Sequence, residues 1–251
     1  MIKTLIKAAK KPWHISNLYH IAGQTELAEK LTNNSSCDQV FFCNSGAEAL
    51  ETSLKIIRKY SEFIKKPHRK EIITFKDAFH GRTIGAISAA GSKKYQEGYA
   101  PLLPGFVNVD TENLTIKKLA QHINKNTAAI FLEPIQGEAG VIVPDTLYIK
   151  EASDLCKQNN VLFMADEIQT GIARTGSLLA ICGDCTCSAH CERGETYTKP
   201  DILILGKALS GGSYPVSAVL ADSEIMDVIR PGQHGSTYGG NPLEIGRAHV
   251  W

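Results

Sequence analysis

The stretch Pro200-Asp-Ile-Leu-Ile-Leu-Gly-Lys207 is the best starting point for predicting the fold. Its four consecutive apolar residues are too few for a helix and are bounded by turn residues, so they predict a fully buried strand. Lys207 therefore ends a strand, directly before the turn Ala208-Leu-Ser-Gly-Gly212. A lysine there loses hydration, which favours the neutral amine that attacks carbonyl groups to form Schiff bases. A solvated surface lysine is the alternative, because most lysines are exposed.

Other short apolar runs precede this one and alternate with helical patterns. Strands are predicted at residues 38–43, 71–75, 128–132 and 161–165. Helices are predicted at residues 25–31 and near 148–159, and a further helix begins within residues 44–49 and runs to about residue 60. The strands show almost no period-2 alternation, which is typical of strands buried on both faces. We therefore expect an α/β fold, a three-layer sandwich with a mainly parallel central sheet and helices on both faces. Its ligand crevice should lie at the carboxyl ends of the strands.

Polar residues follow several of the predicted strands. Ser45, Gly46 and Ala47 come directly after the first, where the free N–H groups of a helix start could bind phosphate. A plain serine N-cap with Glu48 three residues later is the alternative. In the next loop Phe79 could stack on a planar ring and Arg82 could clamp a carboxylate, although packing and a solvated charge explain such residues equally well.

Composition excludes several classes of function. The 251 residues are 43% hydrophobic and 21% charged with a net charge of +1, which is ordinary for a globular protein and gives no electrostatic case for nucleic acid or an anionic membrane as partner. The longest apolar runs are far shorter than the ~20 residues of a membrane span. The basic, helical start at residues 1–11 predicts a surface helix in a cytoplasmic protein, with a mitochondrial presequence as the weaker alternative.

Four of the seven cysteines fall in one segment: Cys182, Cys185, Cys187 and Cys191, with His190 adjacent. Such clustering can hold structural zinc, but the spacing is irregular, so a reduced cysteine-rich surface loop remains the alternative.

Six motifs together resemble one family, the class III aminotransferases of the ornithine and acetylornithine type, which use pyridoxal phosphate on a fold type I large domain. The motifs occur in family order: NSGAEA at 44–49, FHGRT at 79–83, EPIQGEAG at 133–140, ADEIQTGIARTG at 165–176, ILGKALSGG at 204–212 and HGSTYGGNPL at 234–243.

The resemblance implies roles for individual residues around the cofactor. Lys207 would form the Schiff base and then shuttle the proton as general base and acid. Asp166 would keep the pyridine nitrogen protonated, whereas a helix cap or solvated charge is the alternative that the neighbouring Glu167 fits better. Ser45, Gly46 and Ala47 would bind the phosphate. Phe79 would stack on the cofactor ring with His80 beside it, and Gln169 would reach the 3′ oxygen. Ser236 and Thr237 would reach the phosphate of the other subunit's cofactor.

For the substrate, the resemblance implies that Arg82 binds a carboxylate, that Glu138 forms an acidic gate and that Tyr19 lines the pocket. The partners would be an amino donor, 2-oxoglutarate and a second copy of the chain in a homodimer with shared active sites. The reaction would move the terminal amino group of ornithine or N-acetylornithine to 2-oxoglutarate. The front half resembles acetylornithine aminotransferases, and the part from about residue 131 resembles ornithine aminotransferases. The sequence would then be either a true intermediate between the two enzyme types or a join between two genes.

The resemblance also divides the chain. Residues 1–20 would be the remnant of an N-terminal segment, and residues 21–243 the large cofactor-binding domain, with a cysteine-rich insertion at 181–199. The C-terminal small domain would be missing. The last residues, EIGRAHVW at 244–251, resemble translated sequencing adapter, so we expect a non-native tail. The other functions to test are a truncated, non-catalytic homologue with a zinc-binding loop, and another class III enzyme such as a different omega-aminotransferase, a racemase or an aminomutase.

Overall fold

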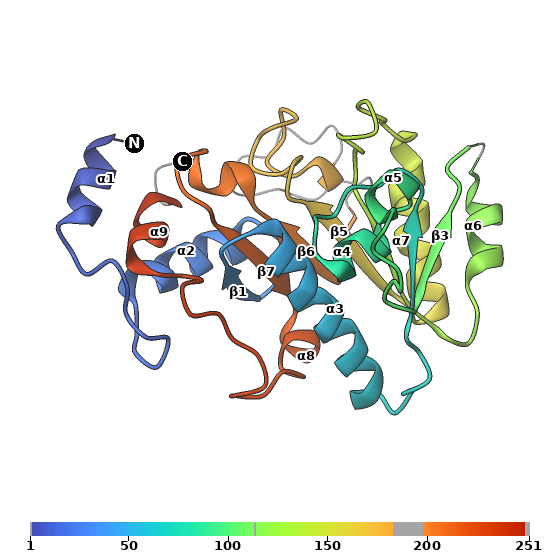
Figure 1. Cartoon of the computed structure of the whole chain (residues 1–251), viewed down its shortest axis with the longest axis horizontal. Coiled ribbons are helices and arrows are strands. Elements are labelled where there is room, and N and C mark those ends of the chain that lie inside the picture. Colours follow the sequence, from blue (N-terminus) through green and yellow to red (C-terminus); the bar gives the residue numbers. More distant parts are fainter. Residues whose placement is uncertain (1, 113, 183–197, 249–251) are drawn as a thin grey trace.

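The described residues form a seven-stranded sheet at the centre of the molecule (Figure 1). The computed structural model describes residues 2–112, 114–182 and 198–248. The sheet order is β1-β7-β6-β5-β4-β2-β3. The strands are β1 (Gln39–Cys43), β2 (Glu71–Phe75), β3 (Phe106–Val109), β4 (Thr127–Leu132), β5 (Leu162–Glu167), β6 (Ile202–Leu205) and β7 (Ser217–Ala221).

Of the described strands, all except β7 run in the same direction. β7 pairs antiparallel with both of its neighbours, β1 and β6, while the pairs from β6 to β3 are parallel. The carboxyl ends of six strands therefore meet at one edge of the sheet, which is where a ligand crevice forms in such folds.

Helices cover both faces of this sheet (Figure 1). The described helices are α1 (Ile2–Ala9), α2 (Ala22–Asn33), α3 (Gly46–Phe63), α4 (Ile84–Ala89), α5 (Lys93–Gln96), α6 (Ile116–His122), α7 (Thr146–Asn159), α8 (Ser223–Met226) and α9 (Pro242–Ala248), with short 3₁₀ turns η1 (Ala180–Cys182) and η2 (Lys207–Ser210).

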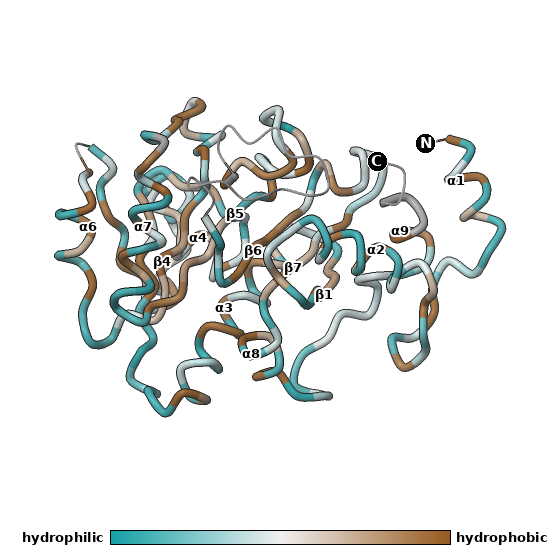
Figure 2. The backbone as a smooth tube through the Cα atoms, turned by 180° about the vertical axis from the view of Figure 1, so that it is seen from behind, coloured by the Kyte–Doolittle hydropathy of each residue, from teal (hydrophilic) through white to brown (hydrophobic). Residues whose placement is uncertain are grey.

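The alternation of side chains along the strands divides the core into two layers. In β6, Leu203 and Leu205 belong to the layer that also contains residues of α2, α6 and α7, whereas Ile202 and Ile204 belong to the layer that contains residues of α3, α4 and α8. Both layers are apolar, as expected for strands covered on both faces. In Figure 2 hydrophobic colour runs along the central strands, and hydrophilic colour is common on the outer helices and turns.

The structure confirms the predicted fold class. The predicted strand at 71–75 matches β2, and the apolar run behind Lys207 is β6. β3 and β7 were not predicted as strands, and β7 adds an antiparallel member to an otherwise parallel sheet. The basic start of the chain forms the surface helix α1, which has no buried residue.

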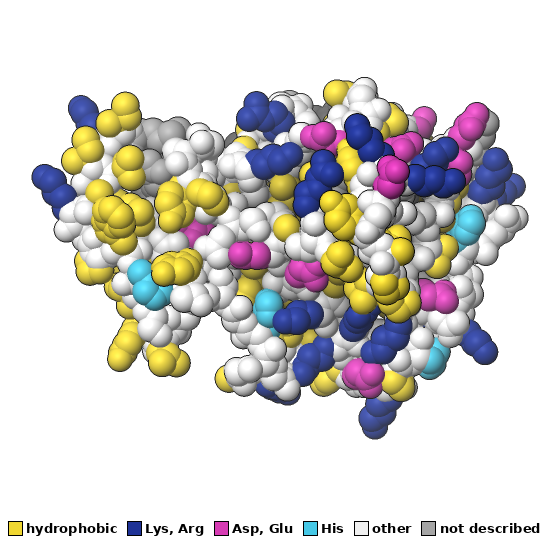
Figure 3. Space-filling model, viewed as in Figure 1, with side chains coloured by type: hydrophobic (Ala, Val, Ile, Leu, Met, Phe, Trp, Pro, Cys, Tyr) yellow, Lys and Arg dark blue, Asp and Glu magenta, His cyan; other side chains and the backbone are white. Residues whose placement is uncertain are grey.

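Hydrophobic side chains gather at the end of the molecule that carries α1 and the segment after it (Figure 3). Ile2, Ile6, Trp13, Leu18 and Tyr19 are all exposed there, and Leu18 keeps 89% of its surface in solvent. Across the described part of the chain, none of the helices combines the length and apolar character needed to span a membrane.

Candidate active site

A pocket of about 300 Å³ opens at the carboxyl edge of the sheet. Residues that follow β1, β2, β4, β5 and β6 line it, together with the segment that leads into β7. The lining residues are Asn44, Ser45, Gly46, Ala47, Phe79, His80, Gly81, Glu133, Asp166, Ile168, Gln169, Lys207, Tyr214, Pro215 and Val216. The topology therefore brings together most of the residues that the sequence assigned to the cofactor.

The N-terminus of α3 forms one wall of this pocket. Ser45 is its N-cap, and the serine Oγ accepts a hydrogen bond from the backbone N–H of Glu48 at 3.2 Å. The Glu48 carboxylate in turn accepts from the backbone N–H of Asn44 at 2.8 Å. The capping arrangement foreseen as an alternative is thus present. It leaves other N–H groups of the first turn without helical acceptors, so the positive end of the helix still faces the pocket.

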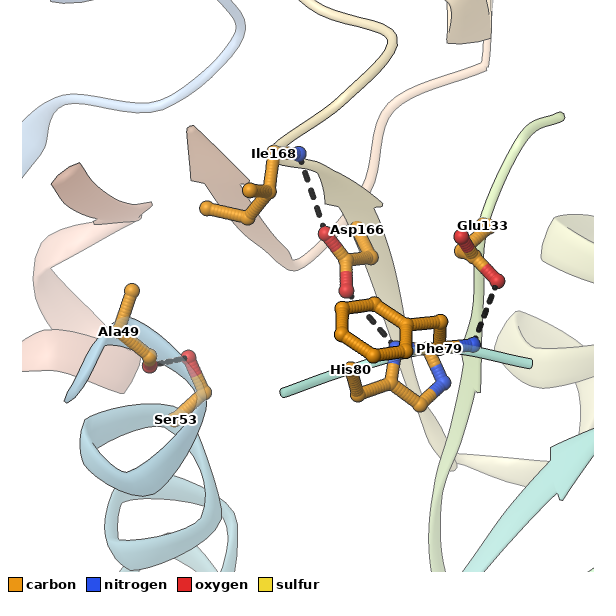
Figure 4. A network of polar contacts seen from close by, with 7 residues as sticks. All are labelled: Ala49, Ser53, Phe79, His80, Glu133, Asp166 and Ile168. Carbon is orange, nitrogen blue, oxygen red and sulfur yellow. Dashed lines mark hydrogen bonds and ion pairs between the residues drawn. The ribbon is translucent and has the colours of Figure 1, made fainter. Parts of the chain in front are cut away.

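Asp166 lies at the end of β5 and is buried. Its Oδ2 atom is 2.8 Å from Nδ1 of His80, and its Oδ1 atom accepts from the backbone N–H of Ile168 at 3.1 Å (Figure 4). The His80 ring stacks on Phe131 with 3.8 Å between ring centroids. Asp166 is therefore held in one orientation by a buried imidazole, and the Nε2 atom of that imidazole has no partner among the described residues.

Glu133 directly follows β4 and contacts the backbone of Phe79. Its Oε2 atom accepts a hydrogen bond from the Phe79 N–H at 3.1 Å (Figure 4). Burial raises the pKa of Glu133 to about 8, and the negative charge of Asp166 adds to the rise. The pocket thus holds a second carboxyl group, which takes up a proton far more readily than an ordinary glutamate.

Lys207 reaches the pocket from the turn after β6. Its backbone φ is +41°, in the left-handed region that residues other than glycine avoid. Its side chain is exposed in the single chain, so the loss of hydration expected from the sequence is not observed. The strained backbone nevertheless fits a functional position, where such conformations are concentrated.

Gln169 lies against Gly137, which belongs to the loop after β4. A Cβ atom at Gly137 would overlap the Gln169 amide. The Oε1 atom of Gln169 is buried and has no hydrogen-bond partner among the described residues. Because a buried amide oxygen without a donor is costly, this atom is available for a donor that enters the pocket.

Glu167 differs from its predicted environment. The sequence favoured a helix cap or a solvated charge, but the side chain is completely buried. Its carboxylate accepts from the Thr170 hydroxyl and from the N–H groups of Ala180 and Ile181, at distances between 2.5 and 3.0 Å. These donors keep Glu167 away from the pocket, which leaves Asp166 as the carboxylate of β5 that lines it.

Ser236 and Thr237 line a separate hollow that shares Asn44, Ser45 and Ala47 with the pocket. The Ser236 hydroxyl accepts from Nδ2 of Asn44 at 3.1 Å, which fixes this loop beside the N-terminus of α3.

The residues assigned to the substrate lie outside the pocket. Tyr19 is 69% exposed, Glu138 is exposed, and Arg82 is at the rim with its guanidinium carbon 5.3 Å from the Phe79 ring centroid. Of the predicted zinc ligands, the Cys182 side chain, Cys185, Cys187 and Cys191 fall outside the described residues. Elsewhere in the described chain, no group of three or more histidine, cysteine, aspartate or glutamate side chains has metal-binding geometry.

Glu133 and Tyr95 were not predicted as site residues. Glu133 comes directly after the apolar run Ala128 to Leu132, as Asp166 comes directly after the run Val161 to Ala165, so the same pattern could have identified it. Tyr95 lies in the short helix α5 and contacts Phe79 and Arg82 through its ring. Nothing in its local sequence marks that contact.

Comparison with known proteins identifies the family. The family model for class-III aminotransferases matches residues 1–249. "Ornithine aminotransferase 2" of Staphylococcus aureus strain MRSA252 is 45% identical over 245 residues, which are 97% of this chain and 58% of that protein. The chain belongs to the class III aminotransferase family, whose members use pyridoxal phosphate.

Solved structures give the same result. The crystal structure of ornithine aminotransferase from Toxoplasma gondii ME49 superposes with a TM-score of 0.88 at 38% identity, covering 98% of this chain and 56% of that one. Acetylornithine aminotransferase from Elizabethkingia anophelis gives a TM-score of 0.77 at 41% identity, with the same coverage of both chains. The chain thus spans a little more than half the length of these relatives.

Proposed function

We propose that the protein is a pyridoxal-phosphate-dependent aminotransferase that moves the terminal amino group of ornithine or N-acetylornithine to 2-oxoglutarate. The observation that carries the proposal is a single pocket lined by Lys207, by Asp166 and by the N-terminus of α3. An amine, a carboxylate and a helix start are the groups that an aldehyde, a pyridine nitrogen and a phosphate require.

The residues present fit this cofactor. The partnerless Oε1 of Gln169 and the buried Asp166 carboxylate both belong to pocket residues, and Phe79 supplies an aromatic face. Ser45, Gly46 and Ala47 would bind the phosphate. When bound, pyridoxal phosphate supplies an electron sink for the bond that breaks at the substrate carbon.

The chain's own residues divide the remaining work. Asp166 would hold a proton on the ring nitrogen, and His80 keeps the Asp166 carboxylate oriented. Lys207 would supply the amine that holds the cofactor, and its Nζ atom would take the proton from the substrate carbon. Asp166→Ala should therefore lower the rate far more than the cofactor affinity.

A homodimer belongs to the same proposal. Ser236 and Thr237 would reach the phosphate of the other subunit's cofactor, and the exposed apolar side chains near α1 offer a surface that a second copy could cover. The cytoplasmic location, the structural zinc, the domain boundaries and the non-native tail at 244–251 stay predictions.

The direct test is reduction of the purified protein with borohydride after incubation with pyridoxal phosphate, followed by peptide mass spectrometry. The label should be on Lys207 and absent from Lys207→Ala. Half-reactions with ornithine and N-acetylornithine would then choose the donor. Turnover without dependence on 2-oxoglutarate would indicate a racemase or aminomutase, and protein that takes up no cofactor would contradict the proposal.

A further inference from the structure

Arg82 has an unusual environment for a charged residue beside a pocket. No carboxylate lies within ion-pair distance of it in the described chain. Its guanidinium carbon instead lies 4.3 Å from the centroid of the Tyr95 ring and 5.3 Å from that of Phe79. Both distances are within the range of cation–π attraction.

The two rings also contact each other. Phe79 and Tyr95 pack edge to face, with 5.7 Å between centroids and 81° between planes. Tyr95 is partly buried, and its ring contacts both Phe79 and Arg82. Arg82 therefore rests on an aromatic pair, one member of which lines the pocket.

The helix that carries Tyr95 is fastened to the helix that follows Arg82. Gln96, the last residue of α5, donates through Nε2 to the carbonyl oxygens of Ile87 at 2.9 Å and Ala90 at 2.7 Å, at the end of α4. At the other end of α4, Thr83 is the N-cap and accepts from the Ala86 N–H at 3.0 Å. The chain that leaves Arg82 through α4 and α5 therefore turns back, and Tyr95 lies against Arg82.

Stacking and carboxylate binding use different parts of a guanidinium group. The aromatic ring contacts the face of the plane, whereas a carboxylate binds in the plane through two N–H groups. The Arg82 guanidinium carbon lies over the Tyr95 ring and has no carboxylate partner in the described chain, so its N–H groups are available for an anion. The ordering that bidentate binding requires is then already present before the substrate arrives.

We propose that Tyr95 is a positioning residue that orients Arg82 for the carboxylate group of the substrate. This inference rests on the proposed aminotransferase function, which gives Arg82 a carboxylate to bind. Tyr95 acts through its ring and not through its hydroxyl group, because the contacts to Arg82 and Phe79 are both ring contacts.

The test is calorimetric titration of the cofactor-loaded protein with 2-oxoglutarate. Tyr95→Leu should weaken binding about two- to fivefold, as expected for loss of one partly exposed cation–π contact. Tyr95→Phe keeps the ring and should bind as tightly as the wild type. In an Arg82→Ala background Tyr95→Leu should have no further effect, and cofactor uptake should be the same in all variants.

Three results would overturn the inference: unchanged affinity in Tyr95→Leu, weaker binding that persists in the Arg82→Ala background, or a loss of cofactor uptake, which would mean that Tyr95 acts through Phe79.

A second readout depends on neither cofactor nor turnover. The ring current of Tyr95 should shift the NMR resonance of the Arg82 Nε–H, and Tyr95→Leu, but not Tyr95→Phe, should move it. An unmoved resonance contradicts the proposed contact, whereas wild-type protein without cofactor uptake contradicts only the proposed function.

Discussion

The Nδ1 atom of His80 lies 2.8 Å from Oδ2 of Asp166, and both side chains are buried beside the pocket. His80→Phe should lower the free energy of unfolding by about 1–3 kcal/mol, because the carboxylate loses a buried partner. Urea denaturation measures the change. The exposed His68 offers the control, since His68→Phe should leave stability unaltered. Equal stability of the His80 variant and the wild type would show that the pair contributes nothing to the fold.

Glu133 should make stability depend on pH. Its pKa is raised from 4.5 to about 8 in the folded chain, so between these values the folded state keeps a proton that the unfolded state releases. The free energy of unfolding of the wild type should therefore fall as pH rises through this window, by at most about 1.4 kcal/mol for each pH unit.

Glu133→Gln cannot ionise but can still accept from the Phe79 N–H. Its stability relative to the wild type should increase from pH 4.5 to 8 and then level off, in denaturation curves measured at several pH values. Glu138→Gln, an exposed change in the same loop, should show no such trend. A difference between Glu133→Gln and the wild type that stays constant with pH would contradict the raised pKa.

Gly137 should affect cofactor binding through its contact with Gln169. Alanine at 137 would displace the Gln169 amide, which can rotate away, so the cost should appear in cofactor binding rather than in folding. We expect about tenfold weaker binding of pyridoxal phosphate, the value of roughly one hydrogen bond, in a fluorescence titration. In a Gln169→Ala background the same substitution should be neutral. An undiminished effect there would mean that Gly137 acts on another group.

The left-handed backbone at Lys207 predicts an order of stability for two variants that both lack the amine. Lys207→Gly should be more stable than Lys207→Ala by about 1 kcal/mol, because glycine adopts positive φ without strain. Lys117, an exposed residue within α6, should show the opposite order, since glycine weakens a helix. Thermal or urea unfolding of the four variants decides the point, and the same order at both positions would argue against strain at Lys207.

The elements that the sequence predicted well are those whose local pattern agrees with their burial. β2 and β6 are apolar runs between turn residues, and their bounds follow from composition alone. β3 is harder to predict because it contains Asn108, a polar residue in a strand. Its amide donates to the Thr74 hydroxyl and the Ala89 carbonyl, partners that exist only in the folded chain. β7 was missed because its small residues resemble a connecting segment.

The residues of the candidate site also divide into those that could be predicted from the sequence and those that could not. Residues at or just after the carboxyl ends of parallel strands, such as Asp166 and Lys207, could be predicted, because the topology places strand ends together. The contact between Arg82 and Tyr95 could not, because it depends on how α5 is fastened to α4. The exposure of Lys207 was also beyond prediction, since hydration depends on what covers the pocket and not on the strand before it.

The position of β7 has a consequence for synthesis of the chain on the ribosome. β1 leaves the ribosome early, yet its only pairing partner among the described strands is β7, with Cys43 opposite Ser217. Until β7 has been made, β1 has no neighbour and one edge of β6 stays open, and such unpaired edges favour aggregation. The helix start after β1 joins the other strand ends only when this late strand inserts. Nascent chains that stop before residue 217 should therefore depend on chaperones, whereas those that extend past residue 221 can close the sheet.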